Sequence, residues 1–482
     1  MPEYNTFVIS NSGQAKLLDT SLMHFVDHDP SIRLPILSEK AKDICRNHIH
    51  KRRDTPKLFA YYISDEPEVR GINAKALEQV YQIFSEEDPY HPVIISNFAM
   101  HSIHTFARTA DINGLHPYPL FLKDKRVNDL SSVIIAVEGA VKAFKNSKHK
   151  QTIAYLHQGF NYGDYGSVSN RIPTYTEYRN QNLLALICGA NGFIQYNRKY
   201  AHYPELYIGM PHLVREKNAL GPVVLAPVSK IQPTTTNSKV KMLLKEYDGH
   251  LYLFVCNAQM MPQTISIDVP GLGLRAKELS VLSQGRVVSL DGDRLTDQFD
   301  TFEANVYTTA TELPDLLTVS EIVELIDKAN RKRHKLGNLV FQMDEGGDVV
   351  VTASSHVGIR HRRPDTGLWH VVDGVISQSD RYQSLTWQDQ TDRKFPDWLE
   401  IKMPHEKRIG RVVVYPYQKS LRDYIVQAFI EGQWKDLAQV TGQNSDRIEH
   451  PFEAVVSDRI RIYVTAANSK KSMITEIEVY EK

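Results

Sequence analysis

Two neighbouring carboxylates follow an apolar run, and they are the residues of this sequence best placed to do chemistry. The run LFAYYIS at 58–64 precedes Asp65, Glu66 and Pro67. Its length and β-type residues predict a buried strand, which Pro67 ends because it cannot donate a ladder hydrogen bond. A carboxyl group at such a strand end can transfer a proton in an active site. The alternative interpretation is that both carboxylates only open the loop and cap the next helix.

Other predicted strands also end on polar side chains. The predicted strands are 58–64, 93–97, 111–115, 152–160 and 192–197, and they alternate with predicted helices at 36–50, 73–86, 130–146, 175–189 and 211–220. This alternation predicts parallel βαβ units, and five strands with polar ends favour a barrel. The candidate ligand-binding residues at these ends are Asn97, His116, Tyr118, His157, Gln158 and Asn197. Any of them alone could be a structural polar group.

A doubly wound α/β domain is the alternative fold. It needs a reversal of strand order and usually a glycine-rich phosphate loop. No glycine-rich loop of this kind follows any of the predicted strands. The pattern therefore favours the barrel.

Composition excludes several classes of partner and site. Lys plus Arg equals Asp plus Glu at 57 each, which argues against a nucleic-acid partner. Cys45, Cys188 and Cys256 lie far apart and lack metal-binding spacing, so no disulfide framework is indicated. No apolar stretch is long enough to span a membrane, and MPEYNTFVIS lacks the features of a signal peptide. The sequence does not indicate an oligomeric state.

The pattern changes after residue 222. Short strands separated by Asp-Gly, Gly and Pro turns predict an antiparallel β-sandwich over 223–310. A helical linker follows within 311–340, with Thr318 or Ser320 as the N-cap and Gly337 as the stop. A second set of strands, among them WHVVDG at 369–374, predicts a sandwich or jelly roll over 341–482.

The last 140 or so residues resemble a discoidin-like domain, also described as the F5/8 type C fold. The resemblance is carried by TASSH, VVDG, PDWLEI, EGQWK, DRIRI and EIEVYE. It implies carbohydrate binding by loops at one end, and a structural calcium ion held by Asp373 and Glu476. No cofactor for catalysis is implied.

Six aromatic residues of this domain fall into two groups, those in predicted strands and those in loop-like stretches. Trp398 and Trp434 stand in predicted strands and are expected in the core. The others stand in loop-like stretches, where their rings could pack on sugars; these are Trp369, His370, Tyr382 and Trp387.

Residues 1–222 resemble a TIM-barrel glycoside hydrolase. YYISDEPE is similar to the strand end that carries the acid in these enzymes, and DINGLHPYP, LHQGFNYG and NGFIQY are similar to later strand ends. The resemblance implies that the strand before Asp65 is the fourth of the barrel, and that FVISN at 7–11 is the third. The first two strands would then be missing. The same resemblance implies a secreted or periplasmic protein.

The expected function is hydrolysis of O-glycosidic bonds in an oligo- or polysaccharide, with Glu66 as general acid and Asp65 beside it. Tyr62 and Phe160 are expected to stack on sugar rings. Glycosidases usually need two separated carboxyl groups, which adjacent residues cannot provide. Either Asp164 supplies the second group, or the N-acetyl group of the substrate replaces it with Asp65 as its orienting residue, or the site is degenerate. The alternative function is carbohydrate binding without catalysis.

Overall fold

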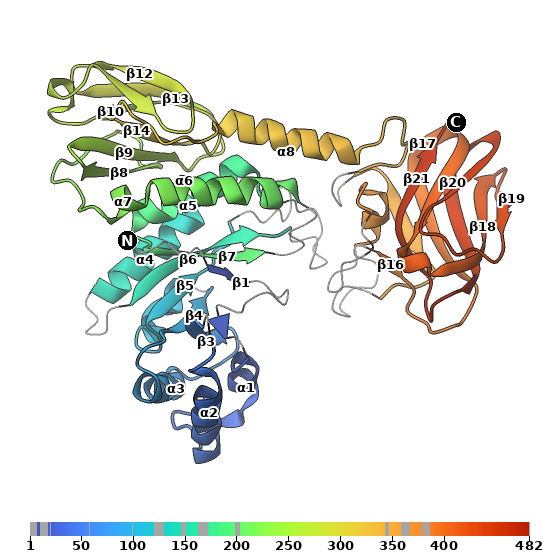
Figure 1. Cartoon of the computed structure of the whole chain (residues 1–482), viewed down its shortest axis with the longest axis horizontal. Coiled ribbons are helices and arrows are strands. Elements are labelled where there is room, and N and C mark those ends of the chain that lie inside the picture. The colour runs from blue at the N-terminus through green and yellow to red at the C-terminus, as the bar shows by residue number, and fades with distance from the viewer. Residues whose placement is uncertain are drawn as a thin grey trace.

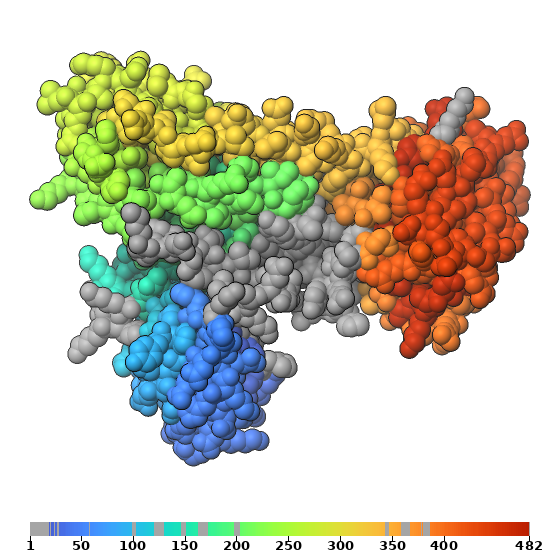
Figure 2. Space-filling model, in the orientation of Figure 1, coloured from blue at the N-terminus to red at the C-terminus, as the bar shows by residue number. Residues whose placement is uncertain are grey.

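The computed structural model describes residues 7–9, 18–19, 21–56, 58–98, 100–119, 130–145, 151–161, 172–197, 203–342, 347–357, 367–376, 378 and 386–481. Three β-sheets lie one after another along the chain, and a long helix leads to the last of them (Figure 1). In the space-filling view the C-terminal sheet forms a separate lobe at one end of the molecule (Figure 2). The predicted domain bounds at 222, 310 and 340 stay predictions.

The first sheet is parallel throughout and has the strand order β1-β7-β6-β5-β4-β3-β2. Its strands are β1 (Phe7–Ile9), β2 (Leu18–Asp19), β3 (Ala60–Asp65), β4 (Val93–Asn97), β5 (Ile112–Leu115), β6 (Thr152–Gly159) and β7 (Gly192–Asn197). The predicted parallel pairing of the strands at 58–64 and 93–97 is therefore confirmed. Because β3 to β7 lie side by side in chain order, these strands lack the reversal that a doubly wound fold requires.

The placement of the N-terminal strand differs from the prediction. We expected 7–11 to lie beside the strand that ends on Asp65, but β1 pairs with β7, with Phe7 opposite Ile194. The two-residue β2 takes the position beside β3. An apolar triplet fits either open edge of a parallel sheet, so its sequence did not identify its neighbour. In the described part of the chain β1 and β2 do not pair with each other, so the sheet is a half-barrel rather than a closed barrel.

The helices of this region begin close to their predicted positions. They are α1 (Met23–His28), α2 (Glu39–Arg52), α3 (Ala74–Glu87), α4 (Ser131–Lys145), α5 (Tyr175–Cys188), α6 (Met210–Ala219) and α7 (Gly221–Leu225). Three short turns of helix stand beside them: the 3₁₀ helices Pro30–Arg33 and Met100–Phe106 and the π-helix Glu205–Gly209. Side-chain caps fix the starts of α2, α3 and α5, and at α5 Thr174 and Glu177 form a reciprocal capping box.

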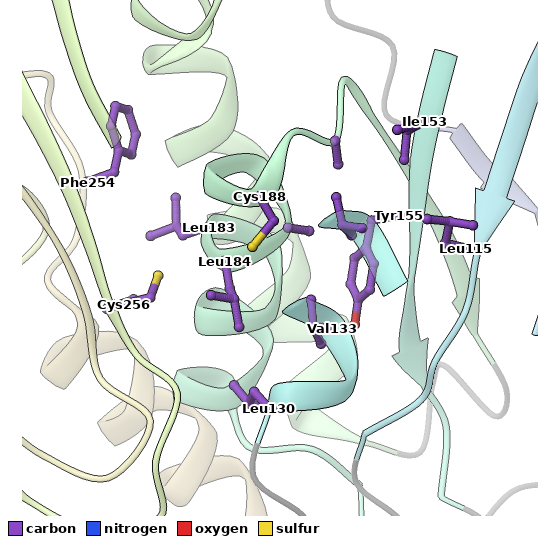
Figure 3. Close-up of a cluster of buried hydrophobic side chains, with 14 of the residues drawn as sticks. Leu115, Leu130, Val133, Ile153, Tyr155, Leu183, Leu184, Cys188, Phe254 and Cys256 are labelled. Atoms are coloured by element: carbon purple, nitrogen blue, oxygen red, sulfur yellow. The ribbon is translucent and has the colours of Figure 1, made fainter. Parts of the chain in front are cut away.

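Helix α5 is buried between the parallel sheet and the second domain. Figure 3 shows Leu183, Leu184 and Cys188 between Tyr155 on the sheet side and Phe254 on the other. The polar face of α5 is buried too. Arg179 donates to Glu216 of α6 at 2.6 and 2.8 Å, and the amide of Asn180 donates to three backbone carbonyls of the second domain. The two domains therefore share one core.

The second domain is a seven-stranded antiparallel sheet arrangement in the order β10-β13-β12-β11-β14-β9-β8. Its strands are β8 (Val240–Tyr247), β9 (His250–Asn257), β10 (Gln263–Asp268), β11 (Glu278–Val281), β12 (Arg286–Asp291), β13 (Arg294–Phe299) and β14 (Ala304–Thr308). A one-turn 3₁₀ helix, Leu272–Leu274, joins two of them.

The linker helix α8 spans Val319–Arg333 and runs toward the C-terminal lobe (Figure 1). Thr318 caps it, in a capping box with Glu321. The prediction that Gly337 ends it is wrong. The chain leaves the helix at His334, whose backbone is extended, and the left-handed Gly337 follows three residues later.

The C-terminal sheet contains β15 (Val350–Ala353), β16 (Trp387–Gln388), β17 (Asp397–Pro416), β18 (Leu421–Ile430), β19 (Gln433–Val440), β20 (Ile448–Ala467) and β21 (Met473–Tyr480). The strands β17 and β20 are long, and register shifts bend them around one apolar core. The expected strand at WHVVDG is wrong, because Leu368–Val372 forms a 3₁₀ helix. His370 and Asp373 close that turn with a 2.8 Å hydrogen bond. A second short 3₁₀ helix, Tyr417–Lys419, follows β17.

Candidate functional site

The C-terminal ends of β3 to β6 bring most of the predicted site residues to one edge of the parallel sheet. Parallel strands end on the same side of a sheet, so side chains far apart in sequence meet there. The residues that this edge assembles are Tyr62, Asp65, Glu66, Ser96, His116, Tyr118 and Phe160.

Asp65 is held by three donors. The Tyr62 hydroxyl donates to Oδ1 at 3.0 Å and the Ser96 hydroxyl at 2.6 Å, while Arg70 donates to Oδ2 at 3.1 Å. The hydroxyls of Tyr62 and Ser96 also contact each other. Neighbours on two strands and one loop thus fix the orientation of this carboxylate.

Glu66 follows with a strained backbone. Its φ is +50°, in the left-handed region that residues with a side chain seldom adopt. The backbone N–H donates to the Ser96 carbonyl at 2.9 Å, and the Glu66 carbonyl accepts from Val69 and Arg70. Burial, and then the charge of Asp65, raise the pKa of the Glu66 carboxyl above its usual range. A strained, half-buried carboxyl group with a raised pKa is suited to act as an acid.

His116 lies between the two carboxylates. Its Nε2 is 3.8 Å from Asp65 Oδ1, and its Nδ1 is 3.9 Å from Glu66 Oε1. The ring is 3 % exposed, and neither nitrogen has a hydrogen-bond partner in the described part of the chain. Burial lowers the pKa of this imidazole. Two buried ring nitrogens without a hydrogen-bond partner among the described residues therefore lie beside Asp65 and Glu66.

Aromatic rings form a wall on one side of these groups. The centroids of His116 and Tyr118 are 5.0 Å apart in a stacked arrangement, and Phe98 stacks on His116 at 6.1 Å. Phe160 meets the ring of Tyr118 edge-on at 4.9 Å, and Tyr196 lies 5.7 Å from Phe160. Aromatic faces beside polar groups are typical of sites that bind sugar rings.

Three contacts at this edge were missed by the sequence reasoning, those of Glu68, Arg70 and Ser96. Glu68 accepts from the Asn97 amide at 2.7 Å and from the Phe98 backbone N–H at 2.7 Å, which ties the loop after β3 to the end of β4. Glu68 belongs to the motif DEPE and Ser96 to the motif VIISN. Their position beside a strand end was the signal that could have identified them as residues of the site.

Of four further predicted binding residues, the structure describes the side chains of two, His157 and Gln158. His157 lies on the opposite face of β6, fully buried, where its ring meets Tyr178 of α5 edge-on. Gln158 is buried, and its amide donates to the Phe160 carbonyl at 3.3 Å. Asn197 ends β7, and its side chain is outside what the structure describes. Asp164 lies outside the described residues.

The two predicted calcium ligands are close to each other in the C-terminal domain. Glu476 is fully buried, accepts from the Gly374 N–H at 3.1 Å, and has no partner for Oε2 in the described part of the chain. Burial and the charge of Asp373 raise its pKa. Asp373 contacts His370 at 2.8 Å and lies 3.7 Å from the Arg333 guanidinium. Within the described ranges, no group of three or more His, Cys, Asp or Glu side chains could hold a metal, so calcium binding by Asp373 and Glu476 stays a prediction.

The predicted sugar-stacking rings of this domain are largely in its interior. Trp369, His370 and Trp387 are 5 %, 2 % and 1 % exposed, so their expected role on loops is wrong. Tyr382 lies outside the described residues. Conversely, Trp398 and Trp434, which we expected in the core, are only half-buried, and Arg461 covers the Trp434 ring at 4.1 Å. An aromatic residue in a loop-like stretch of sequence does not reveal whether its side chain points into the core or toward solvent.

The fold and these contacts define a multidomain protein with a parallel half-barrel and a C-terminal discoidin-like sandwich. Residues 350–477 match the family model of the F5/8 type C domain. No curated protein matches the chain. Within the described ranges, no helix is long and apolar enough to cross a membrane.

Three solved structures illustrate the likeness. A chitosan-binding module of a chitosanase/glucanase from Paenibacillus sp. IK-5 is 17 % identical, with 30 % of this chain and 98 % of that one covered and a TM-score of 0.24. The family 32 module of C. perfringens NanJ in complex with galactose is 16 % identical, with 27 % of this chain and 93 % of that one covered and a TM-score of 0.23. A family 89 glycoside hydrolase from C. perfringens is 22 % identical, with 28 % and 14 % covered and a TM-score of 0.22. At these scores the likenesses carry no argument about activity.

Proposed function

We propose that the protein is a glycoside hydrolase that cleaves O-glycosidic bonds of an oligo- or polysaccharide, with Glu66 as the general acid. The observation that carries the proposal is the different environment of two adjacent carboxyl groups. Three donors hold Asp65 in place, whereas burial and the Asp65 charge raise the pKa of Glu66. When two titratable groups lie in different environments, their pKa values differ, and this difference distinguishes the general acid from the residue that assists it.

The reaction begins with proton transfer from Glu66 to the glycosidic oxygen as the bond from that oxygen to the anomeric carbon breaks. The positive charge that develops on the sugar needs a nucleophile. Because Asp65 and Glu66 are neighbours, they do not flank the bond as two separate catalytic carboxyl groups do. The acetamido oxygen of an N-acetylated sugar would form the new bond to the anomeric carbon, with Asp65 accepting from the acetamido N–H. Water then opens this intermediate, and Glu66 takes the proton of that water.

The surroundings support sugar binding in this orientation. The half-buried ring of Tyr118 would face the apolar side of a pyranose, and the buried rings of His116 and Phe160 pack against it and hold it in place. Asn97 is engaged with Glu68 and would act by holding the strand end in place. Asp164 stays a candidate for a second carboxyl group in a mechanism without substrate assistance.

The C-terminal domain would hold the enzyme on its polymeric substrate. A weak sugar site tethered near a catalytic site raises the effective substrate concentration. Asp373 and Glu476 would bind the structural calcium ion, which would supply no chemistry to the reaction. An enzyme for external polysaccharides would act as a secreted or periplasmic protein.

A carbohydrate-binding protein without catalysis is the second candidate. The observation that favours it is the open parallel sheet, whose edge strands β1 and β2 contain three and two residues. A site supported by an incomplete barrel could keep its affinity for sugar and lose the precision that catalysis needs.

The two candidates are separated by screening aryl glycosides and polysaccharides with the full chain. Glu66→Gln should lower turnover by about 10² to 10⁴-fold, which is the usual contribution of general acid catalysis. Glu86→Gln, on the exposed face of α3, is the matched control and should leave turnover unchanged. Turnover that survives Glu66→Gln would overturn the assignment. Sugar binding without turnover in any of the proteins would support the second candidate.

A further inference from the structure

A second cavity lies away from the carboxylates, on the opposite half of the parallel sheet. It has a volume of about 420 Å³ and opens between the inner face of the strands and helices α5, α6 and α7. Thr152 and Gly192, the first residues of β6 and β7, belong to its wall, whereas Asp65 ends its strand. The volume is within the range of small-molecule sites, roughly 300 to 1,000 Å³. The cavity is therefore separate from the proposed active site.

The wall is mostly apolar, and its polar residues are Thr152, Asn182, Asn191, Glu216, Lys217 and Asn218. The strands contribute one aliphatic side chain each, and the helices contribute leucine and valine side chains. The main apolar residues are Ile94, Ile112, Ile194, Leu183, Leu213 and Val224. A sugar or a phosphate would find few hydrogen-bond partners here, so the wall selects a ligand with an aliphatic body.

One cation interrupts this wall. Lys217 of α6 donates to Asn182 Oδ1 at 3.3 Å, and its ammonium lies 4.6 Å from the centre of the Phe193 ring. No carboxylate in the described part of the chain lies within ion-pair distance of it. The adjacent Glu216 is already engaged by Arg179 at 2.6 Å.

An unpaired buried ammonium is unfavourable in an apolar wall, because a charge taken out of water needs an opposite charge or hydrogen-bond partners. Burial accordingly lowers the pKa of Lys217 to about 7. The other titratable groups that face it are Glu216 and the buried His157, whose own pKa is lowered by burial and then by the Lys217 charge. Neither of them supplies a free negative charge to the cavity.

We propose that this cavity binds an aliphatic monocarboxylate, with the alkyl chain against the apolar wall and the carboxylate on the Lys217 ammonium. The ligand would supply the missing anion and fill the apolar volume at once. A neutral aliphatic molecule would leave the ammonium unpaired, and a small anion would leave the apolar volume unfilled.

The test uses decanoate and decanol as probes of the full chain, by calorimetry and by thermal unfolding. Decanoate should bind more tightly than decanol. Lys217→Met should weaken decanoate binding by at least about tenfold, since a charge-assisted hydrogen bond is lost, and should leave decanol binding within about twofold. Lys51→Met, exposed on α2, is the control and should change neither.

Proton uptake provides an independent readout. At pH 8 the Lys217 amine is largely neutral, and pairing with a carboxylate should raise its pKa, so binding should take up a proton. Calorimetry in buffers of different ionisation enthalpy measures this uptake, which should vanish in Lys217→Met. The proposal would be overturned if decanoate did not bind the parent protein. It would also be overturned if decanoate bound Lys217→Met as tightly as the parent protein and the parent protein took up no proton on binding. If Lys217→Met unfolds, Val224→Trp, which fills the cavity, should block both probes.

Discussion

The Ser96 hydroxyl donates to Asp65 Oδ1 at 2.6 Å and thereby joins the ends of β3 and β4 at the centre of the candidate site. The same hydroxyl contacts that of Tyr62, and the Ser96 carbonyl accepts the Glu66 backbone N–H. Ser96 thus contacts both acidic residues. Its side chain orients Asp65, and its backbone supports the strained turn at Glu66.

Removing this hydroxyl tests whether Asp65 must be oriented. Ser96→Ala should lower kcat by roughly tenfold with less effect on KM, because an orienting contact acts on the bound complex. Tyr62→Phe, which removes the other hydroxyl that donates to Oδ1 of Asp65, should also lower kcat. The measurement is steady-state kinetics on the substrate found by the glycoside screen. A rise in KM alone would instead assign Ser96 to substrate binding.

The pH profile tests the acid role of Glu66. A general acid must be protonated, so kcat/KM should fall as the pH rises through its raised pKa. Two neighbours act on that pKa with opposite signs: the Arg70 charge lowers it and the Glu68 charge raises it. Arg70→Met should therefore move the basic limb to higher pH, and Glu68→Gln should move it to lower pH. Shifts in the same direction for both variants would contradict the assignment.

The buried pair of Arg179 and Glu216 should be important for stability. Arg179 also donates to the Ala304 carbonyl, so it connects α5, α6 and the second domain. Arg179→Met leaves Glu216 buried and unpaired, and should cost about 3 to 5 kcal/mol in free energy of unfolding. Urea unfolding followed by circular dichroism measures this. Lys42→Met removes an exposed pair with Glu39 and should have little effect.

Calcium binding can be followed in the full chain because all four tryptophans lie in the C-terminal domain, at 369, 387, 398 and 434. Their emission therefore reports the unfolding of that domain alone. Added calcium should raise its melting temperature, since a ligand that binds the native state stabilises it. Glu476→Gln, which keeps the shape and removes the charge, should abolish this rise. No response of the parent protein to calcium or to chelator would exclude the site.

The sequence predicted those features that depend on short-range patterns. The buried run before Asp65 and the polar residues at later strand ends predicted the edge of the sheet that carries the candidate site, because strand, proline and carboxylate occur within a few residues of each other. The partner of β1 was not predictable, since a three-residue apolar segment fits either edge of the sheet. The placement of His157 could have been foreseen. Consecutive residues of a strand point to opposite faces, so His157 and Gln158 cannot both face the site.

The last prediction concerns a buried acid pair in the C-terminal domain. Asp397 is 3 % exposed, accepts from the Ser472 hydroxyl at 2.6 Å, and shares a hydrogen bond with Asp389. Asp389 is itself buried and accepts from Thr391 at 2.8 Å. Burial, together with the Asp389 charge, raises the pKa of Asp397 to about 6. Asp397 therefore releases its proton at a higher pH than an exposed aspartic acid does.

Because the pKa of Asp397 is higher in the folded than in the unfolded chain, its contribution to stability is complete at low pH and is lost as the pH rises through about 6. Asp397→Asn mimics the protonated acid. Its free energy of unfolding relative to that of the parent protein should rise from pH 4.5 to pH 7.5, measured by tryptophan emission in urea. Asp446→Asn, on the exposed surface, should show no such pH-dependent gain. A stability difference between Asp397→Asn and the parent that stays constant from pH 4.5 to 7.5 would show that the pKa of Asp397 is not raised.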